Sequence, residues 1–165
     1  MSKLVFGKPA PKQVEKMNKD TPLIDVNYSF LPNRSPPGHN SLEAVQELKK
    51  VQEAQKSKTP EMDEVFKQLD RSISAPFRQY CKYHNLHFDE RYFNELLENL
   101  ETITLRLKYE YNRARPNQLA EYINMPFSNY ATATAQTPSY PSGHALQSRV
   151  IANILSEMYP AYSED

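Results

Sequence analysis

The sequence predicts an all-α fold, and two observations carry this prediction. Apolar side chains recur every three or four residues along 92–107 and again along 145–158, which is the spacing of a helix with one buried face. No segment alternates apolar and polar residues as a half-buried strand does, and no internal repeat is present. A chain of 165 residues is long enough for one domain.

Residues 1–40 differ in character from the rest of the chain. They carry six of the 13 prolines and show little sustained period. We therefore expect an extended proline-rich arm over 1–40 and a helical domain over 41–165.

Helix-start signals divide the first part of that domain. The first helix is expected to begin at Asn40, because asparagine followed by Glu43 forms a capping-box pattern. The second is expected to begin at Thr59 and Pro60, a threonine cap with proline at the first helical position. A short third helix is expected over 75–84.

The longest helix is expected to begin after Asp89, which can cap it, and to end just before Pro116. A short helical segment over 118–123 and a polar, proline-containing loop over 125–141 follow. The last helix has Ser142 as its expected N-cap and carries the clearest apolar face in the sequence.

Charge and composition narrow the function classes. Lysine plus arginine and aspartate plus glutamate both number 20, so the formal net charge is zero and nothing indicates a nucleic-acid face or a polybasic membrane anchor. No apolar run is long enough to span a membrane, and the N-terminus lacks the apolar core and cleavage site of a signal peptide.

Cys81 is the only cysteine, which excludes an intrachain disulfide and fits a reducing compartment. We predict a cytoplasmic protein with no nucleic-acid partner and no integral membrane insertion.

The last helix begins with the sequence Pro-Ser-Gly-His, residues 141–144. The first turn of a helix presents unpaired N–H groups and the positive end of the helix dipole, which together favour an anion. Gly143 would let a ligand approach the backbone, and a histidine such as His144 can hand a proton to a departing oxygen near neutral pH. Taken alone, this segment also fits a capped helix with a surface histidine.

Cationic side chains mark the end of the preceding long helix. Lys108 and Arg115 are seven residues apart, which would place both on one face of a continuous helix. A flexible point charge and a planar guanidinium suit the several oxygens of a phosphate. Taken alone, these cations also fit a solvated basic end that complements the helix dipole.

Together the two segments resemble a known pattern. A lysine, six residues and Arg-Pro, here Lys108 to Pro116, followed by Pro-Ser-Gly-His, here Pro141 to His144, are the first two of three signature motifs of the type 2 phosphatidic acid phosphatase superfamily. The second segment is most similar to that of the soluble class A bacterial acid phosphatases. The resemblance covers roughly residues 92–158 and implies a helical bundle of the acid phosphatase and vanadium haloperoxidase type.

The resemblance also implies a role for each matching residue. Lys108 and Arg115 would bind and neutralise phosphate oxygens, Ser142 would hydrogen-bond an oxygen through its hydroxyl, and Gly143 would donate its backbone N–H. His144 would act as general acid on the leaving alkoxide. The implied activity is hydrolysis of a small phosphorylated substrate, a phosphoric monoester. No metal and no cofactor are implied, although vanadate can occupy the same pocket as a phosphate mimic.

The third signature motif is not found. It consists of Ser-Arg, five residues, a nucleophilic His, three residues and Asp. Here Ser148 and Arg149 are followed by Leu155 at the histidine position, and no histidine follows His144. We interpret Ser148 and Arg149 as a pair on a helix surface, and we expect the domain to be C-terminally incomplete. Ile154 and Leu155 would then require cover from a complementing C-terminal segment or from a homo-oligomer.

The other candidate nucleophiles are interpreted as structural or surface residues. His39 lies in a loop ahead of the first helix, His84 and His87 lack further metal ligands, and Cys81 has no assignable base.

Three function classes remain open on sequence grounds. The first is an acid phosphatase-like hydrolase. The second is a catalytically incomplete module used for phosphate binding or for assembly, and the third is a vanadate-dependent haloperoxidase-like enzyme.

Overall fold

The computed structural model describes residues 4–26, 35–128, 132 and 134–163, and within them it contains seven α-helices, one short 3-10 helix and no strand. The all-α class predicted from the sequence is confirmed for these residues. The helices are α1 (Pro11–Met17), α2 (Leu42–Lys56), α3 (Pro60–Arg71), α4 (Ala75–Tyr83), α5 (Glu90–Tyr111), α6 (Pro116–Tyr122), α7 (Gly143–Met158) and the 3-10 helix η2 (Pro160–Tyr162). None of these described helices is long and apolar enough to cross a membrane.

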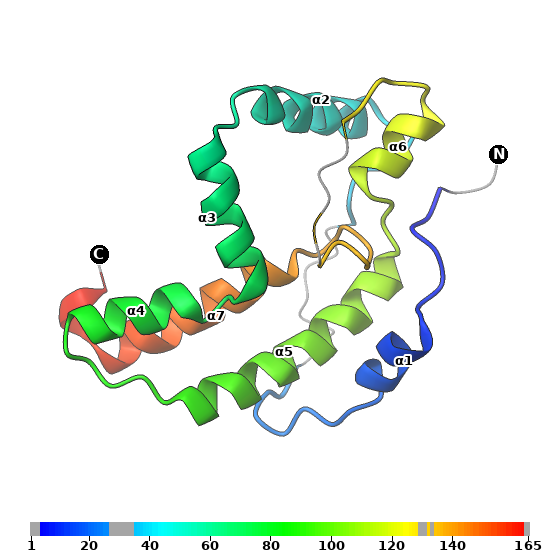
Figure 1. The fold of residues 1–165 in the computed structure, drawn as a ribbon. Coiled ribbons are helices and arrows are strands. Elements are labelled where there is room, and N and C mark those ends of the chain that lie inside the picture. Colours follow the sequence, from blue (N-terminus) through cyan, green and yellow to red (C-terminus); the bar gives the residue numbers. More distant parts are fainter. Residues whose placement is uncertain (1–3, 27–34, 129–131, 133, 164–165) are drawn as a thin grey trace.

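The helices pack in two groups (Figure 1). In the first, α5 and α7 lie against each other, with α4 beside α7 and α1 on α5. In the second, α2 packs against α6. Between the groups, α3 connects α2 to α4 and buries none of its residues.

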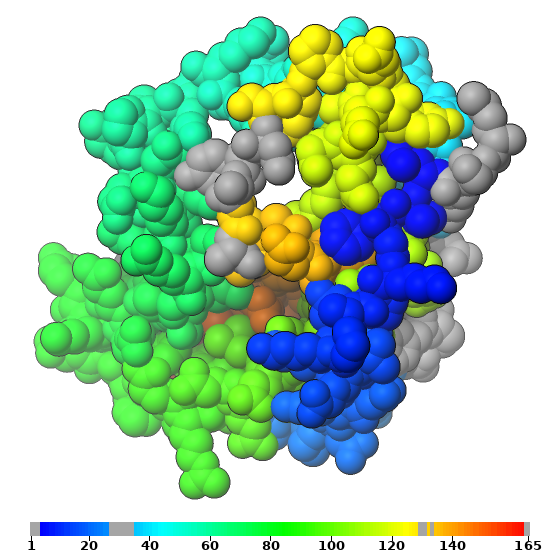
Figure 2. Space-filling model, turned by 45° about the vertical axis from the view of Figure 1, so that its right-hand side comes forward, coloured from blue at the N-terminus to red at the C-terminus, as the bar shows by residue number. Residues whose placement is uncertain are grey.

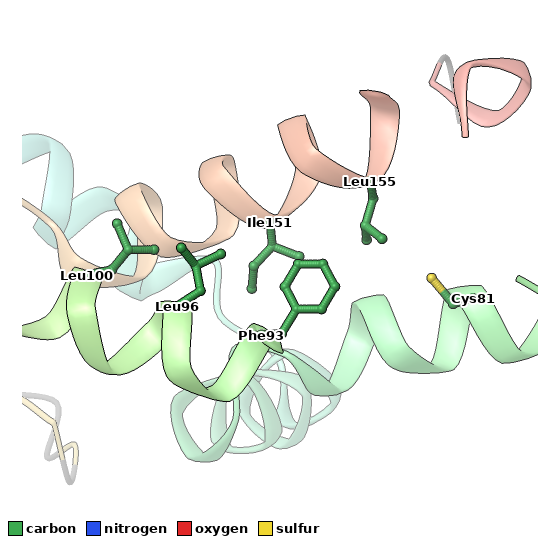
Figure 3. Close-up of a cluster of buried hydrophobic side chains, with 6 residues drawn as sticks. All are labelled: Cys81, Phe93, Leu96, Leu100, Ile151 and Leu155. Atoms are coloured by element: carbon green, nitrogen blue, oxygen red, sulfur yellow. The ribbon is translucent and has the colours of Figure 1, made fainter. Parts of the chain in front are cut away.

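The larger core lies between α5 and α7, and α4 closes one end of it. Phe93, Leu96 and Leu100 project from α5 toward Ile151 and Leu155 of α7, with Cys81 of α4 at the end of the row (Figure 3). Phe93 and Ile151 are completely buried. Leu155, which the sequence analysis expected to need cover from a further helix, is only 9% exposed because α4 and α5 cover it within this chain.

A second, smaller core joins α2 to α6. Its buried residues are Ala44, Leu48, Leu119 and Ala120. Close contact between the two helices is possible because alanines lie on both sides of the interface.

Three of the four predicted helix caps are confirmed. The side chains of Thr59, Asp89 and Ser142 accept hydrogen bonds from the backbone N–H groups of the first turns of α3, α5 and α7. The predicted cap at Asn40 is wrong by one residue: Ser41 is the N-cap of α2, and its Oγ accepts from the N–H of Ala44 at 3.1 Å.

The boundary between α5 and α6 also differs from the prediction. We expected one helix to continue almost to Pro116 and the next segment to begin near 118. Instead α5 ends at Tyr111, because Asn112 adopts the left-handed conformation (φ 47°) and its N–H bonds the carbonyl of Lys108 at 2.8 Å. Helix α6 then begins at Pro116 itself, where proline is favoured.

The predicted extended arm is not extended throughout. Residues 11–17 form α1, which the sequence analysis missed, and α1 packs on α5. The side chain of Arg106 holds its C-terminal end by donating to the carbonyls of Met17 and Lys19, both at 2.7 Å. Residues 27–34 of the arm, and parts of the predicted loop over 125–141, lie outside the described residues.

Candidate functional site

One cavity of about 360 Å³ brings together residues from α3, α5, α7 and the start of α6. All five residues singled out by the two motifs line it: Lys108, Arg115, Ser142, Gly143 and His144. In space-filling view, this face of the molecule is hollowed between α3 and α6, with the segment that precedes α7 (orange) on the floor (Figure 2).

Lys108 lies in the last turn of α5 and is only 7% exposed. Its Nζ donates to the carbonyl of Pro138 at 2.6 Å, a bond that ties the loop before α7 to α5. Burial, and secondarily the positive charge of Arg115, lower the pKa of Lys108 to about 8. At neutral pH the side chain is therefore a buried cation, with two further ammonium N–H groups available to a ligand.

Arg115 does not share a helix face with Lys108, so the geometry inferred from their spacing is wrong. The turn at Asn112 redirects the chain, and Arg115 becomes the N-cap residue of α6. Its Nε donates to the carbonyl of Thr137 at 2.7 Å, and burial lowers the pKa of its guanidinium. The two cations reach the same cavity from two different elements.

Ser142 and Gly143 form the N-terminus of α7. The Oγ of Ser142 accepts from the N–H of Ala145 at 3.3 Å, which leaves its own proton available for donation. A Cβ added at Gly143 would lie 3.5 Å from the Cγ2 of Thr104, an ordinary contact distance. Packing within the chain therefore does not require glycine here, whereas a ligand that approaches the backbone N–H would.

His144 lies in the first turn of α7 with its side chain 43% exposed. Its Nε2 is 3.7 Å from Oδ1 of Asp70, a residue in the last turn of α3 whose side chain is 10% exposed. Thr134 also donates a hydrogen bond to this carboxylate. Sequence reasoning missed Asp70, because nothing local distinguishes it from the other acidic residues of an amphipathic helix.

A larger cavity of about 990 Å³ adjoins the first. Asp70, Arg115, Ser142 and His144 line both, so these residues form the boundary between them. The larger cavity is bordered by many apolar side chains, among them Val51, Phe66, Leu69, Phe77 and Phe127.

The remaining candidate residues lie elsewhere. The ring of His39 contacts Tyr122 edge-on at 5.1 Å, and His84 packs among Tyr80, Tyr83 and Tyr162. His87 lines neither cavity. Within the described part of the chain, no group of three metal-ligating side chains is present.

The only cysteine and the residues at the positions of the third motif also lie outside the smaller cavity. Cys81 is buried in the larger core, and burial raises the pKa of its thiol, as is typical of a structural cysteine. Leu155, at the position of the nucleophile in the third motif, is also in that core. Ser148 borders the larger cavity, and Arg149 is exposed on α7.

Comparisons with known proteins give no further guidance, because no family model, curated protein or solved structure matches this chain.

Proposed function

We propose that this chain holds the phosphoryl group of a phosphoric monoester in the smaller cavity and acts as an acid phosphatase-like hydrolase with His144 as its general acid. The observation that carries the proposal is the convergence of a buried cation (Lys108), a half-buried cation (Arg115) and a helix N-terminus on one cavity.

The charge balance of the cavity supports an anionic ligand. Burying a cation is costly unless an anion or several acceptors compensate for lost hydration. Among the described residues, neither Lys108 nor Arg115 forms a salt bridge. Lys108 instead donates to the carbonyl of Pro138, and Arg115 donates to the carbonyl of Thr137. Two carboxylates also border this cavity, but Glu101 is paired with Lys16 and Asp70 lies beside His144. A phosphate dianion would supply a negative charge for Lys108 and Arg115, and the backbone N–H groups at the start of α7 would bind it in the same place.

The position of His144 supports its role as acid. It lies on the boundary between the two cavities, so a phosphoryl group in the smaller one would have its ester oxygen directed toward the larger. A proton given to that oxygen neutralises the leaving alkoxide as the P–O bond breaks. Lys108, Arg115 and Gly143 would stabilise the charge on the equatorial oxygens in the transition state.

A second candidate function is phosphate binding without turnover. It is favoured by one observation: His144 is the only one of the chain's four histidines that lines either cavity. No second histidine that could act as the nucleophile therefore borders either cavity, and without another nucleophile, such as a water molecule, the cavity would only bind.

The test measures binding and turnover separately. Isothermal titration with vanadate and with inorganic phosphate should show binding that Lys108→Met and Arg115→Gln each weaken at least tenfold, because each removes a charge-assisted hydrogen bond. Arg149→Ala is the matched control, since it removes an exposed cation from α7 and should bind normally. Absence of vanadate and phosphate binding in the native chain would disprove the proposal.

Hydrolysis of an aryl phosphate, assayed from about pH 5 to 7.5 where a histidine changes charge, then separates the two candidate functions. Turnover that His144→Ala abolishes establishes the hydrolase. Binding without turnover establishes the binding module.

A further inference from the structure

Thr104 is a buried polar residue beside the candidate site that neither motif includes. It lies one helical turn before Lys108 on the same face of α5, is 3% exposed, and borders the smaller cavity. Within the described part of the chain its Oγ1 has no hydrogen-bond partner.

An unpaired hydroxyl in this position is unusual. A threonine inside a helix commonly bonds the carbonyl four residues earlier, and buried hydroxyls are nearly always paired. Leaving one unpaired costs stability, whereas valine has the same shape and no such cost. The unpaired Oγ1 of Thr104 therefore indicates a hydrogen-bond partner that is not part of the chain, such as a bound ligand.

The surroundings of Thr104 identify the chemistry of that partner. Its methyl carbon is 3.5 Å from the position of a Cβ on Gly143, so the side chain lies against the first turn of α7. Threonine in a helix occupies two χ1 rotamers, and an oxyanion beside Gly143 requires the one that places the hydroxyl, instead of the methyl group, on that side. Two charged residues of α5, Glu101 and Lys108, border the cavity on either side of Thr104. Glu101 is paired with Lys16, whereas Lys108 has no ion-pair partner among the described residues, so an acceptor of hydrogen bonds is favoured there.

We infer that Thr104 is a further oxyanion-binding residue, whose hydroxyl donates a hydrogen bond to the phosphoryl group held by Lys108 and Gly143. This inference rests on the proposed function. Thr104 and Lys108 would bind the group from α5, while Ser142 and Gly143 would bind it from α7, so the oxyanion would be held between the two helices of the main core.

Isosteric variants test the inference with vanadate as the ligand. Thr104→Val should bind vanadate about tenfold more weakly, the loss expected for one hydrogen bond to a charged group, while the ligand-free variant unfolds at a temperature no lower than the native chain. Thr104→Ser keeps the hydroxyl and should bind nearly as the native chain does.

Thr102→Val is the matched control on the same helix. Thr102 is equally buried, but its Oγ1 donates to the carbonyl of Lys16 at 3.2 Å and it does not border the cavity. We expect this variant to unfold at a lower temperature and to bind vanadate normally, the opposite of the Thr104→Val result.

The outcomes separate this inference from the function on which it rests. Native affinity in Thr104→Val, together with weak binding in Lys108→Met, would overturn the role of Thr104 and leave the proposed function standing. A lower unfolding temperature in Thr104→Val would show that the hydroxyl has a structural partner and would also overturn the inference. If the native chain binds neither vanadate nor phosphate, both fail.

Discussion

At the scale of single residues, Lys108 shows how a buried charge links the site to stability. Burial lowers its pKa to about 8 in the folded chain from 10.5, so between these values the unfolded chain binds more protons than the folded one. Stability therefore rises as the pH increases from about 8 to 10.5, because the unfavourable buried charge is lost. Below about pH 8 that unfavourable contribution is fully present.

This argument predicts a difference between the native chain and Lys108→Met. The free energy of unfolding of the native chain, minus that of the variant, should increase steadily between pH 8 and 10.5, because only the native chain carries the titrating group. Urea denaturation across this range measures it, with Lys50→Met as a control for loss of an exposed lysine. A difference that stays constant or decreases would contradict the assignment of Lys108 as a buried cation.

Single residues also show what the sequence could and could not reveal about the site. Ser142, Gly143 and His144 are consecutive, so their place in the first turn of one helix followed from local signals alone. Asp70 and Thr104 reach the cavity only through tertiary packing. Nothing in their neighbourhood along the sequence marks them, because their relation to His144 and Gly143 depends on how α3 and α5 lie against α7.

At the scale of elements, the start of α7 combines a structural cap with a candidate ligand contact. Ser142→Ala should lower the free energy of unfolding by about 1 kcal/mol, whereas Ser142→Gly should cost only a few tenths, since glycine is a tolerated N-cap. Both variants lack the hydroxyl, so both should bind vanadate more weakly by a similar factor. Chemical denaturation and calorimetric titration give the two quantities.

The cap of α3 provides the control for that comparison. Thr59→Ala removes a similar cap hydrogen bond, from the N–H of Met62, and Thr59 borders neither cavity. Vanadate affinity should therefore remain at the native value. If Ser142→Gly also keeps native affinity, the hydroxyl of Ser142 only caps the helix.

The turn between α5 and α6 decides where Arg115 lies. Asn112 holds φ 47°, a left-handed conformation that asparagine tolerates better than most residues. Asn112→Ala should lower the free energy of unfolding by about 1–2 kcal/mol. It should also weaken vanadate binding, because a relaxed turn would displace Arg115 from the cavity.

Asn85 is the matched control for this turn. It has φ 55° just after α4, and it borders neither cavity. Asn85→Ala should cost a similar free energy of unfolding and leave vanadate affinity unchanged. Equal effects of the two variants on affinity would show that the turn at Asn112 has no special relation to the site.

The helices differ in how far their boundaries could be predicted from the sequence. Caps such as Thr59 and Asp89 are local, and the sequence located them correctly. The end of α5 depends on a single left-handed residue, Asn112, while apolar residues at helical spacing continue on both sides of it. Helix α1 is only seven residues long and is held by Arg106 of α5, a contact between distant parts of the chain.

At the scale of the whole molecule, the smaller cavity lies where the two helix groups meet. Lys108, Gly143 and His144 come from α5 and α7 of the larger core, whereas Arg115 caps α6 of the smaller one. The N-terminal segment strengthens this junction, because the N–H of Phe6 bonds the carbonyl of Asn112 at 3.0 Å and Gln118 donates to the carbonyl of Phe6. An oxyanion bound here would contact both groups at once.

This placement predicts that ligand binding stabilises both cores together. Ile151→Ala in the larger core and Leu48→Ala in the smaller one should each lower the free energy of unfolding by about 2–5 kcal/mol, since both side chains are almost fully buried. Vanadate at about 100 times its Kd should restore about 2.7 kcal/mol in either variant, because the proposed site would bind it only when residues from both groups are in place. Thermal unfolding followed by circular dichroism, with and without vanadate, measures this. Two separate transitions, of which vanadate raises only one, would show that the site belongs to a single helix group and that Arg115 does not contribute to it.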